Sequence, residues 1–457
     1  MKARVLVFFA AMLLSGAALA QGITRDELIQ MRRQTQTREF SARQNAVSNN
    51  PVSRLAASKR GRDGRDNEFT HVIQRPRVTD QARSGWCWLF AGLNVLRFEA
   101  ARALGVKEFE LSESHLFFYH KLELVNYVLS EAMHGRPDPD DPQVAFLLRN
   151  GLGDGGYWGM FTSLAAKYGV VPKDVMPETL HTSNTGESNE LLDALVKGHV
   201  AAIWRMRNDR RPGAEIGARR LAALSDAYRL LALMFGTPPE SFRWRYRGAD
   251  GKLRPYADYT PASFFSAYVR PGLTSKAHLM SDPSLPYYSN FVMPALKNAA
   301  ESWGETFVNV PPGVALEAAR VSVLADEPVW FGADVGKYFD PAGGTLDLGN
   351  YDYEALLGVP LRSTRTDMLR TYASAATHAM VLVGVDIDGE GRPVKWLVEN
   401  SWGPGAGQGG YLTMTSAWFA MYGFDVIVDR RHADETVLAA MATDPKPLPP
   451  WHHLWRP

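Results

Sequence analysis

The sequence predicts an α+β fold in which a helical region that begins near Cys87 and a later β-rich region are separated by further helical segments. A helix is expected to begin at Cys87, because the apolar residues that follow it recur at helical spacing. Two β-like apolar runs begin much later, at His378 and Trp396. Between these two regions lie further helical patterns, at 189–196, 217–234 and 261–268.

Composition places the chain among ordinary globular proteins. It has 457 residues, 50 Lys and Arg against 49 Asp and Glu, and is 46% hydrophobic and 22% charged, which excludes a disordered chain or a fibre. Because Cys87 is the single cysteine, neither an intramolecular disulfide nor a cysteine-built zinc or iron–sulfur site can form. The length suits two or three domains, or one large domain with insertions.

The first twenty residues have the pattern of a secretory signal peptide. Lys2 and Arg4 precede an uncharged apolar run from Val5, which ends in the small-residue sequence Ala-Leu-Ala20 before Gln21. That run of 16 residues is short for a membrane anchor. We therefore expect residues 1–20 to be removed and the protein to be exported, either to the periplasm or to the medium. No later segment is long and apolar enough to predict a membrane span.

Residues 21–67 are expected to form a basic, extended N-terminal arm. Between Met31 and Asn67 there are nine basic and three acidic residues. The positive charges are dispersed and are not interleaved with an aromatic platform for bases. We therefore expect a solvated surface segment and consider nucleic-acid binding unlikely. The globular part begins near Phe69.

Cys87 is the first candidate functional residue. The turn at Ser84-Gly85 precedes it, so the cysteine should lie at a helix N-terminus. Unpaired backbone N–H groups and the positive end of the helix dipole favour a thiolate there. The alternative is a buried cysteine with a structural role only, and position alone does not decide between the two.

His378 and Asn400 are the candidate partners of this cysteine. His378 opens the run that ends at Asp386, and Asn400 closes the run that begins at Trp396. An antiparallel pair of strands would bring the amide beside the imidazole, where its oxygen can accept the ring N–H and fix the tautomer. A core histidine and a turn-forming asparagine remain the alternatives at this point.

Together these motifs resemble the papain superfamily of cysteine peptidases. The resemblance rests on Gln six residues before Cys87, on Ser-Gly-x-Cys-Trp, on Thr-His-Ala and on Glu-Asn-Ser-Trp-Gly. More narrowly, the sequence resembles the bleomycin hydrolase and aminopeptidase C branch of this superfamily. The resemblance runs from about Phe69 to the C-terminus. The segments that indicate this branch are Leu111–Glu123, Asp154–Trp158, Lys167–Lys173 and Val329–Gly336.

The resemblance implies a papain-like two-domain cysteine peptidase fold, with a helical domain, a β-barrel-like domain and a large helical insertion. His378 and Asn400 follow Cys87 by 291 and 313 positions (378−87 and 400−87), against roughly 130 to 150 in compact relatives. In the family such insertions build a ring-like hexamer, so a homo-oligomer is expected. The expected division is 68–180 for the helical domain, 181–310 for the insertion, 311–440 for the β-rich domain and 441–457 for a tail that enters the cleft.

The resemblance also implies the roles of the site residues. Cys87 would be the nucleophile, His378 the acid and base, and Asn400 the group that orients the imidazole. Gln81 and the Cys87 backbone N–H would form the oxyanion hole. Three tryptophans are expected to support the site: Trp402, which would shield the His378–Asn400 hydrogen bond, Trp88, and Trp86, which departs from the family pattern and would line or narrow the cleft.

The expected activity is that of an exported cysteine peptidase, in first place an aminopeptidase acting on short peptides. In the family, the terminal carboxylate of the tail receives the free amino group of the substrate, but the ending at Pro457 is unusually bulky and basic. A papain-like endopeptidase with an open cleft is therefore the first alternative. A noncatalytic assembly or nucleic-acid-binding protein that uses the basic arm is the second.

No cofactor and no metal are expected. A zinc peptidase of the HExxH type is disfavoured because that motif is absent from the sequence. The adjacent pair His452-His453 offers two imidazoles, but the sequence shows no third partner for them and two ligands are a weak signal.

Overall fold

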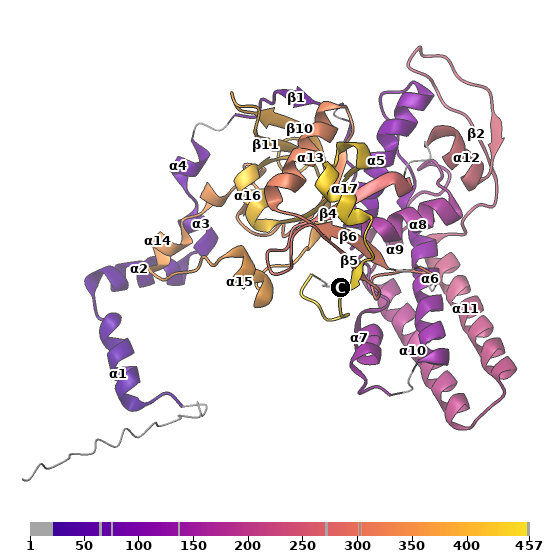
Figure 1. Cartoon of the computed structure of the whole chain (residues 1–457), viewed down its shortest axis with the longest axis horizontal. Coiled ribbons are helices and arrows are strands. Elements are labelled where there is room, and N and C mark those ends of the chain that lie inside the picture. Colours follow the sequence, from indigo (N-terminus) through magenta and orange to yellow (C-terminus); the bar gives the residue numbers. More distant parts are fainter. Residues whose placement is uncertain are drawn as a thin grey trace, which may run out of the picture. The chain divides into compact units, whose positions relative to one another are not determined.

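The structure is a computed structural model and describes residues 22–63, 66–74, 76–135, 138–269, 273–299, 301–302 and 304–454 (Figure 1). The predicted signal peptide, residues 1–20, lies outside the described residues. The chain divides into two units: residues 1–57 with 352–361, and residues 58–351 with 362–457. Within the described part, no helix is both long and apolar enough to cross a bilayer.

The N-terminal arm is helical, so the prediction of an extended segment is wrong. Its helices are α1 (Arg25–Gln34), α2 (Arg38–Asn49), α3 (Val52–Ala56) and α4 (Lys59–Arg62). Capping explains the difference: Thr24 and Glu27 form a reciprocal capping box, and the side chains of Thr37 and Ser58 cap the starts of α2 and α4. Neither α1 nor α2 has a buried residue, which is why no apolar pattern predicted them.

The predicted helical regions are confirmed. A helix begins at Cys87, and the three helical patterns that follow it correspond to α10, α11 and α12. The long helices α6, α10 and α11 pack side by side (Figure 1). The helices of this region are α5 (Cys87–Leu104), α6 (Glu113–His134), α7 (Pro142–Asn150), α8 (Trp158–Tyr168), α9 (Leu180–Ser183), α10 (Gly186–Asn208), α11 (Gly213–Phe235) and α12 (Pro261–Tyr268).

A large mixed sheet forms the other half of the second unit. The described strands run in the order β14-β5-β6-β4-β13-β7-β10-β11-β12-β9-β8, and β1 adds to β10. Helices α5 and α13 both pack against β10. The strands are β1 (His71–Val72), β4 (Lys276–Met280), β5 (Ser289–Met293), β6 (Glu305–Asn309), β7 (Val329–Ala333), β8 (Phe339–Asp340), β9 (Thr345–Leu346), β10 (His378–Ile387), β11 (Pro393–Glu399), β12 (Tyr411–Thr415), β13 (Gly423–Asp429) and β14 (Lys446–Pro447).

The helical insertion ends earlier than the sequence suggested. Strands β4, β5 and β6 lie inside the range 181–310, yet all three pair into the large sheet. A separate hairpin of β2 (Phe242–Trp244) and β3 (Ala257–Tyr259) lies within the insertion. The remaining helices are α13 (Pro312–Leu324), α14 (Tyr353–Leu357), α15 (Arg365–Arg370), α16 (Ser416–Tyr422) and α17 (Glu435–Met441).

A buried ion pair fastens helix α5 to the sheet. Arg97 of α5 donates to Glu399 at the end of β11, at 2.5 Å, and their side chains are 3% and 0% exposed. A second guanidinium N–H donates to the carbonyl of Arg77. This contact lies next in sequence to Asn400, so it fixes the end of the strand that carries the candidate amide.

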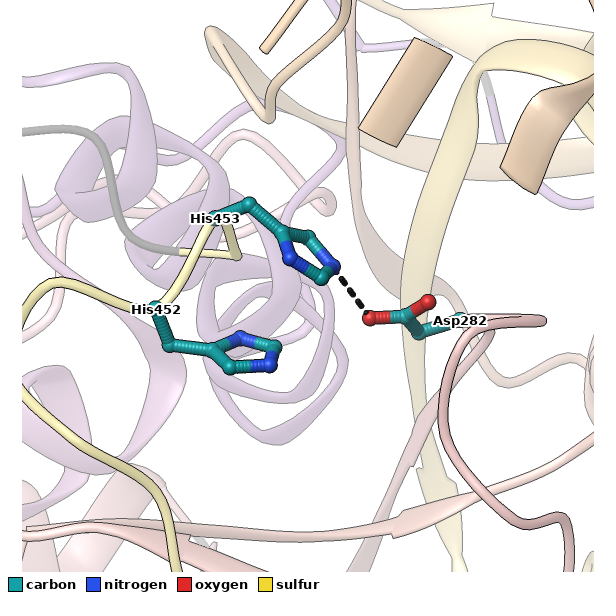
Figure 2. Close-up of side chains that lie close together, drawn as sticks. All are labelled: Asp282, His452 and His453. Carbon is teal, nitrogen blue, oxygen red and sulfur yellow. Dashed lines mark hydrogen bonds and ion pairs between the residues drawn. The ribbon is translucent and has the colours of Figure 1, made fainter. Parts of the chain in front are cut away.

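The C-terminal tail is anchored along its described length. Strand β14 pairs with β5, the Leu448 N–H donates to the Val292 carbonyl at 2.8 Å, and Leu454 is buried. His453 is paired with Asp282 of the segment that follows β4, with 2.7 Å between Nε2 and Oδ2 (Figure 2). The terminal carboxylate that would receive a substrate amino group lies outside the described residues.

Candidate active site

Cys87 is the first residue of α5 and lies in the wall of a pocket of about 550 Å³. Trp86 precedes the helix without a side-chain cap, and the backbone N–H of Trp88 in the first turn of α5 acts on the Cys87 thiol. Cys87 is partly exposed. The helix therefore presents a sulfur atom at its N-terminus, as the sequence predicted.

His378 and Asn400 are brought together by the hairpin of β10 and β11. The two strands are antiparallel, with Val381 opposite Glu399. The imidazole Nε2 lies 2.7 Å from the Asn400 Oδ1, and that oxygen also accepts the Ser401 N–H. Because Oδ1 is an acceptor, Nε2 carries the proton and Nδ1 is left with its lone pair.

The remaining walls of the pocket come from the helical side and from the sheet. His378 lines it together with Cys87, and Trp402 packs on the imidazole with ring centroids 4.7 Å apart. Two of the family-like segments also contribute, through residues 154–157 and through Trp330 and Gly332. The pocket is thus bounded by both halves of the second unit.

The charges of the two central groups are set mainly by burial. Burial raises the pKa of the Cys87 thiol, although hydrogen bonds from the backbone N–H groups of Ala379 and Trp88 act in the opposite direction. Burial also disfavours the charged form of His378 and lowers its pKa to about 4, although the hydrogen bond with Asn400 acts in the opposite direction. The backbone N–H groups at the start of α5 thus act on the thiol in the expected direction, but burial outweighs them.

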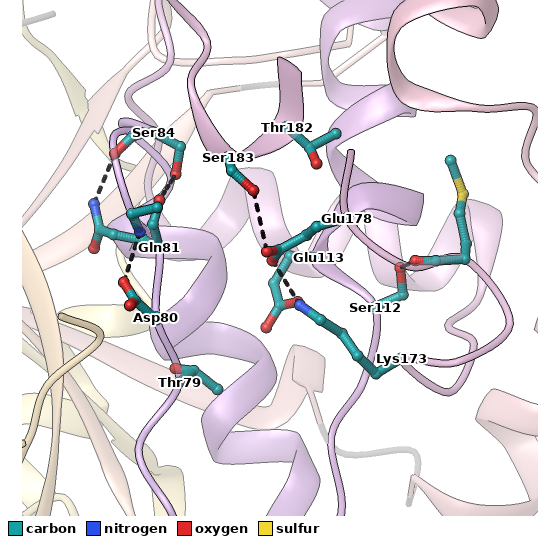
Figure 3. Close-up of polar contacts among 12 residues, drawn as sticks. Thr79, Asp80, Gln81, Ser84, Ser112, Glu113, Lys173, Glu178, Thr182 and Ser183 are labelled. Carbon is teal, nitrogen blue, oxygen red and sulfur yellow. Dashed lines mark hydrogen bonds and ion pairs between the residues drawn. The ribbon is translucent and has the colours of Figure 1, made fainter. Parts of the chain in front are cut away.

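Gln81 is held beside the nucleophile loop by hydrogen bonds with Ser84 and Ser401. Its side-chain Nε2 donates to the Ser84 carbonyl at 2.8 Å, and its Oε1 accepts from the Ser401 hydroxyl at 2.6 Å. Its backbone N–H donates to the Ser401 carbonyl. Figure 3 shows the Gln81 side chain turned toward Ser84. One amide N–H is therefore committed to the loop, and the second is not used by Ser84.

Comparison with known proteins identifies the family. The family model described as "Peptidase C1-like family" matches residues 22–454. The chain belongs to this family. Aminopeptidase C of Streptococcus thermophilus is 33% identical over 90% of this chain and 94% of its own, and human bleomycin hydrolase is 34% identical over 84% and 87%. The solved structure of PepW from Lactobacillus rhamnosis has a TM-score of 0.90 at 32% identity, covering 95% of this chain and 99% of that one.

The chain is therefore a cysteine peptidase with a papain-like α+β fold, as its motifs predicted. Trp86, however, does not narrow the cleft of this peptidase. Its indole is fully buried and stacks on Phe117 of α6, with 3.6 Å between ring centroids, and it also contacts Phe235 of α11. At the position just before a helix, this side chain points into the helical core while the next residue faces the pocket.

Trp88 does line the pocket of the peptidase, and its indole N–H donates to the Asp154 carbonyl at 2.8 Å. Asp154 in turn accepts the Gly85 N–H and pairs with the buried Lys121 at 2.9 Å. Although burial opposes it, Lys121 and the neighbouring hydrogen bonds lower the pKa of Asp154 to about 2. This ionised carboxylate fixes the loop before Cys87.

The sequence did not predict a buried cluster that reaches the pocket. Asp425 lines the pocket, and its Oδ2 lies 2.7 Å from His278 Nε2. The other imidazole nitrogen lies 2.8 Å from Glu305 Oε1. Asp425 also accepts the Gly332 N–H. The available signal was one acidic residue, Asp425, between apolar residues of strand β13, which is a weak one by itself.

The tail of the peptidase reaches the same region. The Tyr157 hydroxyl lies 3.3 Å from the Leu454 carbonyl and donates to it, and Tyr157 lines the pocket that holds Cys87. The described part of the tail therefore ends in contact with a wall residue of the pocket.

Proposed function

We propose that this protein is an exported aminopeptidase that hydrolyses short peptides through Cys87, His378 and Asn400. The observation that carries the proposal is the 2.7 Å hydrogen bond from His378 to Asn400 in a pocket that also holds the single cysteine. The relatives named aminopeptidase C and bleomycin hydrolase support it.

The mechanism depends on which imidazole nitrogen of His378 carries no proton. Because His378 Nε2–H donates to Asn400, Nδ1 takes the proton of the Cys87 thiol as the sulfur attacks the scissile carbonyl. The proton then moves from Nδ1 to the departing amine, and the C–N bond breaks to leave a thioester. Water attacks this acyl-enzyme with His378 as base, which releases the acid and restores the thiol.

Formation of the ion pair is compatible with the burial of both groups. Moving one proton from Cys87 to His378 changes no net charge, and the thiolate and imidazolium then stabilise each other at short range. Each group is neutral when considered alone, since burial disfavours its charged form. Trp402 stacks on the imidazole and keeps water from the His378–Asn400 hydrogen bond.

Gln81 and the Cys87 backbone N–H are proposed as the oxyanion hole. The Gln81 N–H that Ser84 does not use would donate to the developing oxyanion, while the other N–H holds the loop. We expect Gln81→Ala to lower kcat by ~10²–10³-fold, the usual cost of one such donor.

The first experiment compares fluorogenic amino-acid amides that differ in a free or acylated amino group, with the mature protein and reductant. Cleavage of the free-amine member alone, lost in Cys87→Ala, supports the aminopeptidase. Cleavage of the acylated member points to an endopeptidase, which the sequence left as the first alternative. The absence of Cys87-dependent cleavage of either amide would overturn the proposal.

Export is proposed from the first twenty residues of the sequence. The expected product begins at Gln21, because Ala-Leu-Ala20 precedes it. Intact mass measurement of the protein recovered from the periplasm or the medium tests this. Recovery of a chain that still begins at Met1 in the cytoplasm would refute it.

A further inference from the structure

We propose that Asp282, His452 and His453 bind a divalent transition-metal ion, for which Zn²⁺ is the best fit, and that this ion fastens the C-terminal tail. The three side chains each offer one ligand atom, and these atoms lie within 4.8 Å of one another. Figure 2 shows the imidazole of His453 pointing at the carboxylate, with the ring of His452 beside it. The sequence supplied two of these ligands, and the fold supplies the third from 170 residues away (452−282).

The donor set suits zinc. Two imidazoles and one carboxylate are common zinc ligands, with bond lengths of about 2.0–2.2 Å, so ligand atoms around one ion lie within roughly 4 Å of each other. His453 Nε2 already lies 2.7 Å from Asp282 Oδ2. A change in the torsion angles of His452, which is partly exposed, would bring the third atom into range.

Hydrogen bonds fix the position of the Asp282 carboxylate. Asp282 is fully buried, its Oδ1 accepts the Ser284 N–H at 2.8 Å, and its own backbone N–H donates to Asn309 Oδ1. Such outer contacts orient a ligand before the ion arrives. One oxygen, Oδ2, is left to face the two imidazoles.

A nearby guanidinium does not occupy the Asp282 carboxylate. Arg365 is close enough to act on the Asp282 charge, but its Nη atoms donate to the carbonyls of Ser281, Met421 and Gly423. The carboxylate is therefore not bonded to that guanidinium.

An ion at this position would act on the part of the tail that reaches the active-site pocket. Leu454 follows the two histidines directly, and its carbonyl accepts the Tyr157 hydroxyl. Strand β14 holds the tail on the other side of the pair. Zinc would therefore fix the tail immediately before its contact with a wall residue of the pocket.

The test must separate this site from zinc binding by the active-site cysteine. A thiolate and an imidazole bind zinc well, so Cys87 and His378 would bind it too. Titrations are therefore made on the full mature chain carrying Cys87→Ala, whose binding is read by calorimetry with Zn²⁺ alone. This readout does not depend on activity, so it stands even if the proposed aminopeptidase activity fails.

We expect one zinc ion per Cys87→Ala chain, and binding at least ~10-fold weaker after a further His453→Ala, His452→Ala or Asp282→Asn. The exposed His134 of α6 provides the matched control: His134→Ala should leave affinity and stoichiometry unchanged. The two tail histidines are partly exposed, so their variants should fold even if Asp282→Asn does not. Thermal melting of each variant checks this.

Two outcomes would overturn the site. One is the absence of zinc binding to the Cys87→Ala chain. The other is binding that the tail substitutions leave unchanged, or that His134→Ala weakens as strongly. The Co²⁺ form gives an independent readout, because visible absorption typical of a tetrahedral site should appear in the Cys87→Ala chain and disappear when His453→Ala is added to that chain.

Discussion

Replacing Asp425 with asparagine should reduce the loss of folding stability that we expect as the pH becomes alkaline. His278 lies between Glu305 and Asp425, and the three side chains are 6%, 3% and 3% exposed. Burial alone would lower the pKa of His278, but the two hydrogen-bonded carboxylates outweigh it and raise the pKa to about 9 from an ordinary value of 6.5. The imidazolium is therefore part of the folded state at neutral pH.

The sign and size of the effect follow from this shift. Because the folded-state pKa is raised, the stabilisation is fully present below about pH 6.5 and is lost as the pH rises through about 9. A shift of about 2.5 units corresponds to roughly 3 kcal/mol, at 1.36 kcal/mol per unit. The wild-type free energy of unfolding should fall by about this amount between pH 6 and pH 9.5.

Asparagine at position 425 fits a neutral imidazole. Its Oδ1 can keep the Gly332 N–H, which now lies 3.0 Å from Asp425. The amide Nδ2 would then donate to the unprotonated His278 Nε2, while Nδ1–H still donates to Glu305. With one carboxylate removed, the pKa of His278 falls, and less than half of the alkaline loss should remain.

The assay is urea unfolding at pH 6, 7.5 and 9.5, followed by tryptophan fluorescence with reductant. Glu317→Gln is the matched control, since it also removes one carboxylate but from an exposed pair with Arg320, which should contribute little. If Asp425→Asn loses as much stability as the wild type between pH 6 and pH 9.5, the assignment of the alkaline loss to His278 is refuted.

Three further substitutions test the packing. Arg97→Met leaves Glu399 buried without its partner and should cost about 3–5 kcal/mol of unfolding free energy, measured by urea unfolding at neutral pH; a cost below about 1 kcal/mol would contradict this. Gly92→Ala would place a methyl group 2.7 Å from the Phe161 ring, so it should lower stability by about 1–3 kcal/mol in the same assay. Gly198→Ala, also inside a helix but with nothing within 4 Å of the new methyl, should raise stability by about 0.4–1 kcal/mol; equal effects of the two glycine substitutions would refute the packing argument.

The parts of the site that lie close together in sequence could be predicted. His378 and Asn400 are 22 residues apart, and a hairpin with polar residues at its base has few ways to pair. The helix at Cys87 could be predicted because its core residues recur at helical spacing and a turn precedes it. These inferences needed local patterns and one strand pairing.

The predictions that were wrong or missing concern the directions of side chains and contacts between residues far apart in the sequence. Trp86 was expected in the cleft because it adjoins Cys87, but neighbouring side chains at a helix start point about 100° apart, and this one enters the core. The arm was expected to be extended because its composition is polar and basic, whereas side-chain caps start helices there. His278, Glu305 and Asp425 lie on three strands, and no local pattern connects them.

Tyr157 lies next to three features that the sequence did not link: the C-terminal tail, the Cys87 pocket and the carboxylates of the His278 cluster. Its hydroxyl donates to the tail at Leu454, and the residue lines the Cys87 pocket. Burial, assisted by the nearby carboxylates of Asp425 and Glu305, raises its pKa. The phenol is therefore protonated and can act as a donor throughout the pH range in which His278 loses its charge. The contact of the tail with the pocket should thus persist while the cluster behind it titrates, so that activity and stability need not share one pH profile.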